Sequence, residues 1–176
     1  MPSDASLIRL RDLTPSDADI VDAWNAAPER SEFNDFGEPP SSLQRDVLAR
    51  GPMRNEHNGM LLVETVDGVP IGTVGWHKVR YGPNPESDAW NIGIELEPAA
   101  RGRGFGTEAQ RELARYLFDT TDVNRVEAST DVENLAEQRS LKKAGYTREG
   151  IQRGSQYRAG SYHDLVTYAR LRDDRE

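Results

Sequence analysis

Apolar and polar positions alternate most regularly in the middle of the chain. Ile92, Ile94 and Leu96 are separated by polar or small residues, and this period of two predicts a half-buried strand. After a short loop, Ala109, Leu113 and Leu117 recur every fourth residue, which predicts a helix over 108–118 with one apolar face. The pattern therefore predicts a strand, a glycine-rich loop and an amphipathic helix in direct succession.

The same pattern predicts the remaining elements. Strands are expected at 7–11, 60–66, 71–79, 123–130, 147–157 and 162–169, and helices at 14–25, 41–49 and 134–144. Asp67-Gly68 and Ala159-Gly160 predict hairpin turns, and Gly145 predicts the end of a helix. The resulting order, β-α-α-β-β-β-α-β-α-β-β, predicts a mixed α/β sheet.

Composition narrows the class of protein. A length of 176 residues predicts one domain over 1–176, and a net charge of −8 argues against nucleic acid as a partner. The negative charge suits a cationic amine substrate, although solubility explains it equally well. With no cysteine, the chain has no disulfide, thiol nucleophile or cysteine-based metal site, and we expect no metal. Neither a signal peptide nor a span of membrane length is recognised, so we expect a cytoplasmic protein without a membrane partner.

The loop from Arg101 to Thr107 has the features of an anion site. Its glycines stand at alternate positions, so backbone N–H groups can converge at the start of the following helix. Arg101 and Arg103 add positive charge. A P-loop is disfavoured because Gly106 is followed by Thr107-Glu108 instead of Lys and Ser or Thr. The simplest ligand is a phosphate or pyrophosphate, although such turns also occur without a ligand.

Three motifs carry a family resemblance. Arg101-x-x-Gly104-x-Gly106 resembles the acyl-coenzyme A pyrophosphate loop, R/Q-x-x-G-x-G/A, of the GCN5-related N-acetyltransferases (GNAT). The segment from Asn134 to Tyr146 resembles the N-x-x-S…K-x-G-F motif of their ribosomal-protein N-terminal acetyltransferase branch, and Tyr157 to Asp164 resembles its Y-x-x-G-x-Y-x-D hairpin. The resemblance implies the single-domain GNAT fold, a mixed and mostly antiparallel sheet flanked by helices.

The resemblance also implies a cofactor and its contacts. Acetyl-CoA would be the acyl donor, with pantetheine along the central strand, pyrophosphate on the glycine loop, and Asn134 hydrogen-bonding the cofactor. The implied cofactor-binding residues are Ile94, Glu95, Leu96, Arg101, Gly102, Arg103, Gly104, Phe105, Gly106, Thr107 and Asn134. Asn134 equally suits a helix N-cap, and both roles are compatible.

The expected reaction is direct attack of a primary amine on the thioester in a ternary complex. The acceptor is either a small-molecule amine or a protein N-terminus. A non-catalytic acyl-CoA sensor, or transfer of a larger acyl group such as succinyl, is the alternative. A homodimer is compatible with the sequence.

The groups that would move protons depart from the family pattern. Glu137 occupies the position where the family motif has a serine. Leu141 occupies the position where the family usually has a tyrosine, and Ser140 lies one residue before it. At the two positions where the family usually has an acidic residue as general base, this chain has Gln156 and Ile92. Glu137 and Ser140 are therefore the catalytic candidates. Glu137 is either a carboxylate with a raised pKa or, as we favour, a solvent-facing residue of the first helical turn. Further candidates are Glu95, Asp131, His163 and Asp164.

Four aromatic residues are candidates for the acceptor pocket. They are Phe33, Phe36, Trp76 and Tyr157. For Phe33 and Phe36, filling the core beneath a long loop is the slightly favoured alternative. His77 either faces the active-site cleft or, more commonly for a lone histidine on a strand, serves as a surface or structural residue.

Overall fold

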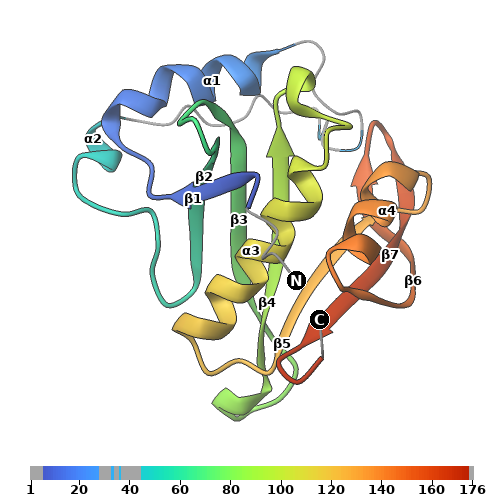
Figure 1. The fold of residues 1–176 in the computed structure, drawn as a ribbon. Helices are drawn as coiled ribbons and strands as arrows, with labels where there is room; N and C mark the ends of the chain where they lie inside the picture. Colours follow the sequence, from blue (N-terminus) through green and yellow to red (C-terminus); the bar gives the residue numbers. More distant parts are fainter. Residues whose placement is uncertain (1–5, 28–32, 34–35, 37–44, 175–176) are drawn as a thin grey trace, which may run out of the picture.

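A seven-stranded sheet forms the centre of the molecule, as a computed structural model shows for residues 6–27, 33, 36 and 45–174 (Figure 1). The strand order is β1-β2-β3-β4-β5-β7-β6. The strands are β1 (Ile8–Arg11), β2 (Asn58–Thr65), β3 (Pro70–Arg80), β4 (Asp88–Leu96), β5 (Arg125–Asp131), β6 (Thr147–Arg158) and β7 (Ser161–Leu171). Within these residues only β4 and β5 pair in parallel. The expected mixed, mostly antiparallel α/β sheet is confirmed.

The helices are α1 (Ala18–Ala26), α2 (Arg45–Leu48), α3 (Phe105–Thr120) and α4 (Leu135–Lys143). They occur in the predicted order, although residues 41–44 of the helix expected at 41–49 lie outside the described residues. Gly145 has a φ of +91°, and Ala159 and Gly160 have φ values of +48° and +82°, which confirms the predicted helix end and hairpin turn. No described helix combines the length and apolarity required for a membrane span.

The two faces of the sheet are covered by different helices. Leu61 and Val63 of β2 pack in the larger core, with α3 and α4. Leu62, between them in sequence, packs in a smaller core with α1 and α2. Because successive strand residues point to opposite faces, α1 and α2 lie on the face opposite to α3 and α4. Figure 1 shows α3 lying across the sheet.

The helix start predicted at Thr14 is held by a buried carboxylate. Asp17 is only 5% exposed and accepts hydrogen bonds from Thr14 N and Oγ1, both at 2.7 Å. The Arg11 guanidinium donates two further hydrogen bonds to the Asp17 carboxylate, at 2.8 and 2.9 Å. These bonds hold the pKa of Asp17 well below its usual range. This ion pair ties β1 to the turn that leads into α1.

The strands β4 and β5 separate halfway along their length. Their pairing is confined to Trp90–Val126 and Asn91–Glu127, whereas β4 continues to Leu96 and remains paired with β3. The backbone of Ile92–Leu96 therefore has no strand partner on its β5 side among the described residues. Ile92 is part of the core on the α3 face, so Asn91, Gly93 and Glu95 point to the α1/α2 face.

Candidate functional site

The glycine loop ends where α3 begins. Gly102 and Gly104 have φ values of +72° and +89°, a conformation that favours glycine because other residues place a Cβ against the backbone. The N-cap of α3 is Gly104, which has no side chain to cap the helix, and Glu108 N is the first amide to bond back to the loop, at Gly104 O. The preceding amides at 105–107 point out of the helix end, where the helix dipole attracts an anion.

Both arginines of the loop are exposed beside this helix end. Arg101 Nε donates to Leu96 O at 3.0 Å, which ties the loop to the end of β4. The Arg103 guanidinium carbon lies 4.9 Å from the centre of the Phe105 ring, at the first residue of α3. The loop therefore combines helix-end amides with two positive charges, an arrangement suited to a pyrophosphate.

The predicted strand, loop and second helix converge at Gly106. A Cβ at Gly106 would lie 3.6 Å from Leu96 Cδ1, 4.0 Å from Ile94 Cδ1 and 3.6 Å from Ser140 Oγ. The hydroxyl oxygens of Thr107 and Ser140 are 3.2 Å apart. Residues from β4, the loop and α4, widely separated in sequence, thus meet around one position.

Asn134 is the N-cap of α4. Its Oδ1 accepts a hydrogen bond from Glu137 N at 3.2 Å, and its Nδ2 donates to Thr130 Oγ1 at 3.0 Å. The N-cap interpretation is confirmed, because both polar groups of the side chain bond within the protein. Its contact with a cofactor stays a prediction.

Glu137 is not solvent-facing, so the interpretation favoured from sequence is wrong. Its carboxylate lies between α4 and α3, where Gln110 Nε2 donates a hydrogen bond to Oε1. Burial raises its pKa to about 7, against the smaller, opposite effect of that hydrogen bond. Gln110 is 1% exposed, and its Oε1 has no hydrogen-bond partner in the described structure. Helix packing, which the sequence motif does not encode, turns a first-turn glutamate inward.

Three of the other candidates, Asp131, His163 and Asp164, are engaged in contacts within the sheet. Asp131 is 3% exposed, forms an ion pair with Arg158, and accepts a hydrogen bond from Glu133 N at 2.8 Å. His163 Nδ1 lies 3.4 Å from the same carboxylate. Asp164 Oδ1 accepts from a backbone N–H of β6, at Gly154, at 2.7 Å. These contacts indicate that Asp131, His163 and Asp164 stabilise the β6–β7 hairpin.

The four aromatic candidates are not brought together. Phe36 is 53% exposed, so the expectation that it fills the core is wrong, and Phe33 is half-buried 5.4 Å from the Arg158 guanidinium carbon. Trp76 is buried, its ring centre 5.8 Å from that of Tyr116 on α3. Tyr157 is 60% exposed on the terminal hairpin, with its ring against that of Tyr162.

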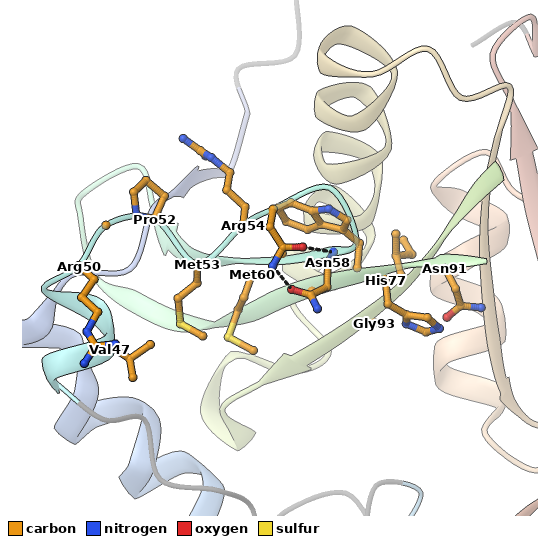
Figure 2. Close-up of a pocket in the computed structure, with 16 residues that line it drawn as sticks. Val47, Arg50, Pro52, Met53, Arg54, Asn58, Met60, His77, Asn91 and Gly93 are labelled. Atoms are coloured by element: carbon orange, nitrogen blue, oxygen red, sulfur yellow. Dashed lines mark hydrogen bonds between the residues drawn. The ribbon is translucent and has the colours of Figure 1, made fainter. Parts of the chain in front are cut away.

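A cavity of about 680 Å³ lies between α2, the 51–55 loop and strands β2–β4 (Figure 2). Val47, Met53 and Met60 form an apolar part of its wall, and Arg50 lies at the end of α2. His77 and Asn91 line the end of the cavity nearest β5, and His77 is exposed, as a surface residue is; its place in an active-site cleft stays a prediction. Trp76 is the only one of the four aromatic candidates among the lining residues of this cavity.

The floor of this cavity combines bare backbone with a row of polar side chains. Gly75 and Gly93 are directly paired across β3 and β4, and a Cβ on Gly93 would meet nothing within 4 Å. The next row along the sheet consists of the registered partners Asn58, His77 and Asn91, which line the cavity; the row continues to Glu127 on β5, which does not. Sequence reasoning missed Arg50, Asn58 and Asn91, because strand register and the packing of the segment after α2 bring them to one cavity.

Comparison with known proteins agrees with this geometry. A family model described as an acetyltransferase (GNAT) domain matches residues 8–147. An uncharacterized N-acetyltransferase, p20, from Bacillus licheniformis is 25% identical over 94% of this chain and 93% of its own length. The putative ribosomal N-acetyltransferase YdaF of Bacillus subtilis (strain 168) is 29% identical over 80% of this chain and 77% of its own. The spermidine N-acetyltransferase from Vibrio cholerae, solved with CoA and spermine, shares the fold with a TM-score of 0.79 at 20% identity, covering 97% of this chain and 98% of that one.

Proposed function

The chain belongs to the acetyltransferase (GNAT) family, and we propose that it moves an acetyl group from acetyl-CoA to a primary amine by direct attack in a ternary complex. The family makes it an N-acyltransferase. One observation carries the proposal for this chain. The separation of β4 from β5 after Asn91 adjoins the anion-binding start of α3, so an extended strand-like group and a pyrophosphate would be held side by side.

The predicted cofactor residues divide this work. The edge of β4 from Ile94 to Leu96, which has no neighbouring strand on its β5 side among the described residues, would hydrogen-bond the pantetheine amides as a neighbouring strand does. The amides at 105–107, with Arg101 and Arg103, would bind the pyrophosphate. Glu95 lies on this same edge with its side chain toward the α1/α2 face.

The reaction forms a C–N bond and breaks the C–S bond of the thioester. The amine must lose a proton, and the departing thiolate gains one. Ser140, whose Oγ lies near Gly106, is our candidate to donate to the thiolate, since it shares the helix face next to the loop. An α-amino group has a pKa near 8 and is partly neutral at pH 7, so a strong base is not required.

Glu137 is our second candidate for proton transfer. It lies one turn before Ser140 on α4, and residues three apart on a helix are neighbours. A carboxyl with a pKa of about 7 is half protonated near neutral pH, so it can either accept or release a proton there. We assign it to the proton pathway through Ser140, not to direct contact with the amine.

The relatives suggest the range of acceptors. One is named a putative ribosomal N-acetyltransferase and another a spermidine N-acetyltransferase. A small-molecule amine and a protein N-terminus therefore both fit the proposal, as does a larger acyl group such as succinyl. A sensor that binds acyl-CoA without turnover is the alternative function, motivated by the missing motif tyrosine and serine at Leu141 and Glu137.

Calorimetry with acetyl-CoA tests the cofactor assignment. We expect micromolar binding that weakens by about 100- to 10,000-fold in Arg101→Ala/Arg103→Ala, because two charge-assisted bonds to phosphate are lost and each is worth about 1.5–3 kcal/mol. Arg148→Ala removes an exposed arginine of β6 and should bind normally. Unchanged binding in the double variant would sink the assignment. Thiol release with a panel of amines then separates an enzyme from a sensor.

A further inference from the structure

The cavity between α2 and β4 contains one side chain that can take up a proton near neutral pH. No aspartate, glutamate, cysteine or tyrosine is among the residues described as lining it. Its two arginines, Arg50 and Arg54, have no acceptor nitrogen, and its asparagines carry amides, which are not basic. His77 is therefore the one basic group of the described lining.

His77 presents its imidazole to this cavity. Trp76 packs in the larger core, so His77, the next residue of β3, points to the α1/α2 face. The side chain is exposed, and within the described part of the chain its ring nitrogens make no hydrogen bond or ion pair. Figure 2 shows it with Asn91 and Gly93 at one end of the cavity. An imidazole without protein partners keeps its acceptor nitrogen for a ligand.

Strand register brings this imidazole within reach of Gly93. His77 is directly paired with Asn91, so Gly93, two residues further along β4, is its diagonal neighbour on the same face. Diagonal neighbours of an antiparallel pair are about 7–8 Å apart, within reach of an aromatic side chain. Gly93 has no side chain, and a Cβ there would meet nothing within 4 Å. The space between the ring and the backbone of β4 can therefore receive an amino group.

The acyl group is expected at this same point of β4. In the proposed function the pyrophosphate lies at the start of α3, where the glycine loop is tied to Leu96 O. Pantetheine runs from there along the free edge of β4, which ends at Asn91, where β4 is paired with β5. The thioester lies at the end of pantetheine away from the pyrophosphate, so it is expected near Ile92 and Gly93.

We propose that His77 is the catalytic base of the transfer and takes the proton of the acceptor amine. The inference rests on the proposed acetyl transfer and adds the group that removes this proton. As the nitrogen attacks, a C–N bond forms, the C–S bond breaks, and one N–H proton passes to the neutral imidazole. The exposed imidazole then releases it to water. The departing thiolate takes its proton from Ser140, on α4, so base and acid act from opposite faces of the sheet.

Four charged groups lie around His77 on this face. They are Arg50, Arg54, Glu95 and Glu127. Arg54 forms an ion pair with Asp12 at 2.7 Å, and Glu127 accepts a hydrogen bond from Arg125 at 2.7 Å. Neither carboxylate of the four lines the cavity. Within the described lining, no carboxylate therefore competes with His77 for the proton of the amine.

The pH dependence of kcat/KM tests this assignment. Thiol release from acetyl-CoA is measured from pH 5.5 to 9.5 with the best acceptor among spermidine, L-alaninamide and an alanine-initiated tripeptide. We expect His77→Asn to lower kcat/KM at pH 8 by about 100-fold or more, since general base catalysis contributes about 10²- to 10⁴-fold. Toward low pH, the slope of log kcat/KM against pH should be smaller by about one in this variant, because one group fewer must lose a proton. His57→Asn alters an exposed histidine outside the cavity and should keep the wild-type profile.

A double variant separates His77 from Glu137, which also titrates near neutral pH. In a Glu137→Gln background, His77→Asn should again reduce the slope by about one. Acetyl-CoA binding, measured by calorimetry, should stay within about twofold of wild type in both His77→Asn and His77→Gln, because the pyrophosphate loop is unchanged.

Three results would overturn the assignment of His77 and leave the transferase intact. They are an unchanged slope in His77→Asn, a rise in KM with kcat unchanged, and weakened acetyl-CoA binding in both His77 variants, which would make the residue structural. Absence of thiol release from the wild type with all three amines would instead contradict the transferase itself.

Discussion

Glu137→Gln should make the protein more stable at high pH and leave it unchanged at low pH. The pKa of Glu137 is raised from 4.5 to about 7 by burial between α3 and α4. Below pH 4.5 the carboxyl is protonated in both the folded and the unfolded protein, and the stability that its protonated form contributes is fully present. As the pH rises through 7, the unfolded protein ionises this carboxyl more readily than the folded protein does, so this contribution to the free energy of unfolding is lost. The difference of about 2.5 between the two pKa values corresponds to about 3 kcal/mol in the free energy of unfolding, at about 1.4 kcal/mol for each pKa unit.

The amide introduced by this substitution has no ionised form to desolvate. Its N–H can also donate to Gln110 Oε1, which has no partner in the described structure of the wild type. We therefore expect the free energy of unfolding of the variant to exceed that of the wild type by up to about 3 kcal/mol at pH 8. For a chain of this size, this corresponds to a rise in Tm of about 6–12 °C.

Urea denaturation at pH 4.5 and pH 8 measures the free energy of unfolding of both proteins. Glu133→Gln, which alters an exposed glutamate just before the same helix, is the control and should follow the wild type. If wild type and Glu137→Gln show the same change between the two pH values, Glu137 is not held in a desolvated site. The same variant tests catalysis separately: we expect a lower rate at saturating acetyl-CoA, and full activity would leave Glu137 a structural residue only.

Two further substitutions test the scaffold. Arg11→Ala should lower the free energy of unfolding by about 2–4 kcal/mol in urea titrations at pH 7, because it leaves the Asp17 carboxylate, 5% exposed, without its main partner. Since Arg11 lowers the pKa of Asp17, this difference should shrink as the pH falls below 3.8, and a constant difference would contradict the assignment. Gly104→Ala should cost about 1–2 kcal/mol, because its φ is +89°, and should weaken acetyl-CoA binding in calorimetry. Gly150→Ala is the control, because φ at Gly150 is not positive and a Cβ there meets nothing within 4 Å; this variant should neither lose stability nor bind acetyl-CoA more weakly. Equal effects of Gly104→Ala and Gly150→Ala would refute the role of the positive φ at Gly104.

Local patterns predicted most of the fold correctly. The alternation at Ile92–Leu96 and the four-residue repeat from Ala109 to Leu117 became β4 and α3, since each period matches the geometry of one element. Turn residues such as Gly145 marked element ends because their backbone conformation is unusual for other residues. The helix start at Thr14 was predicted as well, but the ion pair between Asp17 and Arg11 was not, because that contact joins two elements.

The errors were made where neighbours from other elements decide the outcome. Glu137 was expected to face solvent, yet the packing of α4 on α3 placed it against Gln110. Phe36 was expected in the core and is exposed. In both cases a side chain's surroundings come from residues distant in sequence, which local patterning does not specify.

The sequence by itself determined the family and the element order, and it predicted the glycine loop that we propose as a pyrophosphate site, because these depend on residue types at short, fixed spacings. Only the tertiary structure decided where β4 separates from β5, which is a property of strand register. It also decided that Arg50, His77 and Asn91, from α2 to β4, share one cavity. This cavity is lined by residues far apart in the chain, which come together only when the sheet and the segment after α2 pack against each other.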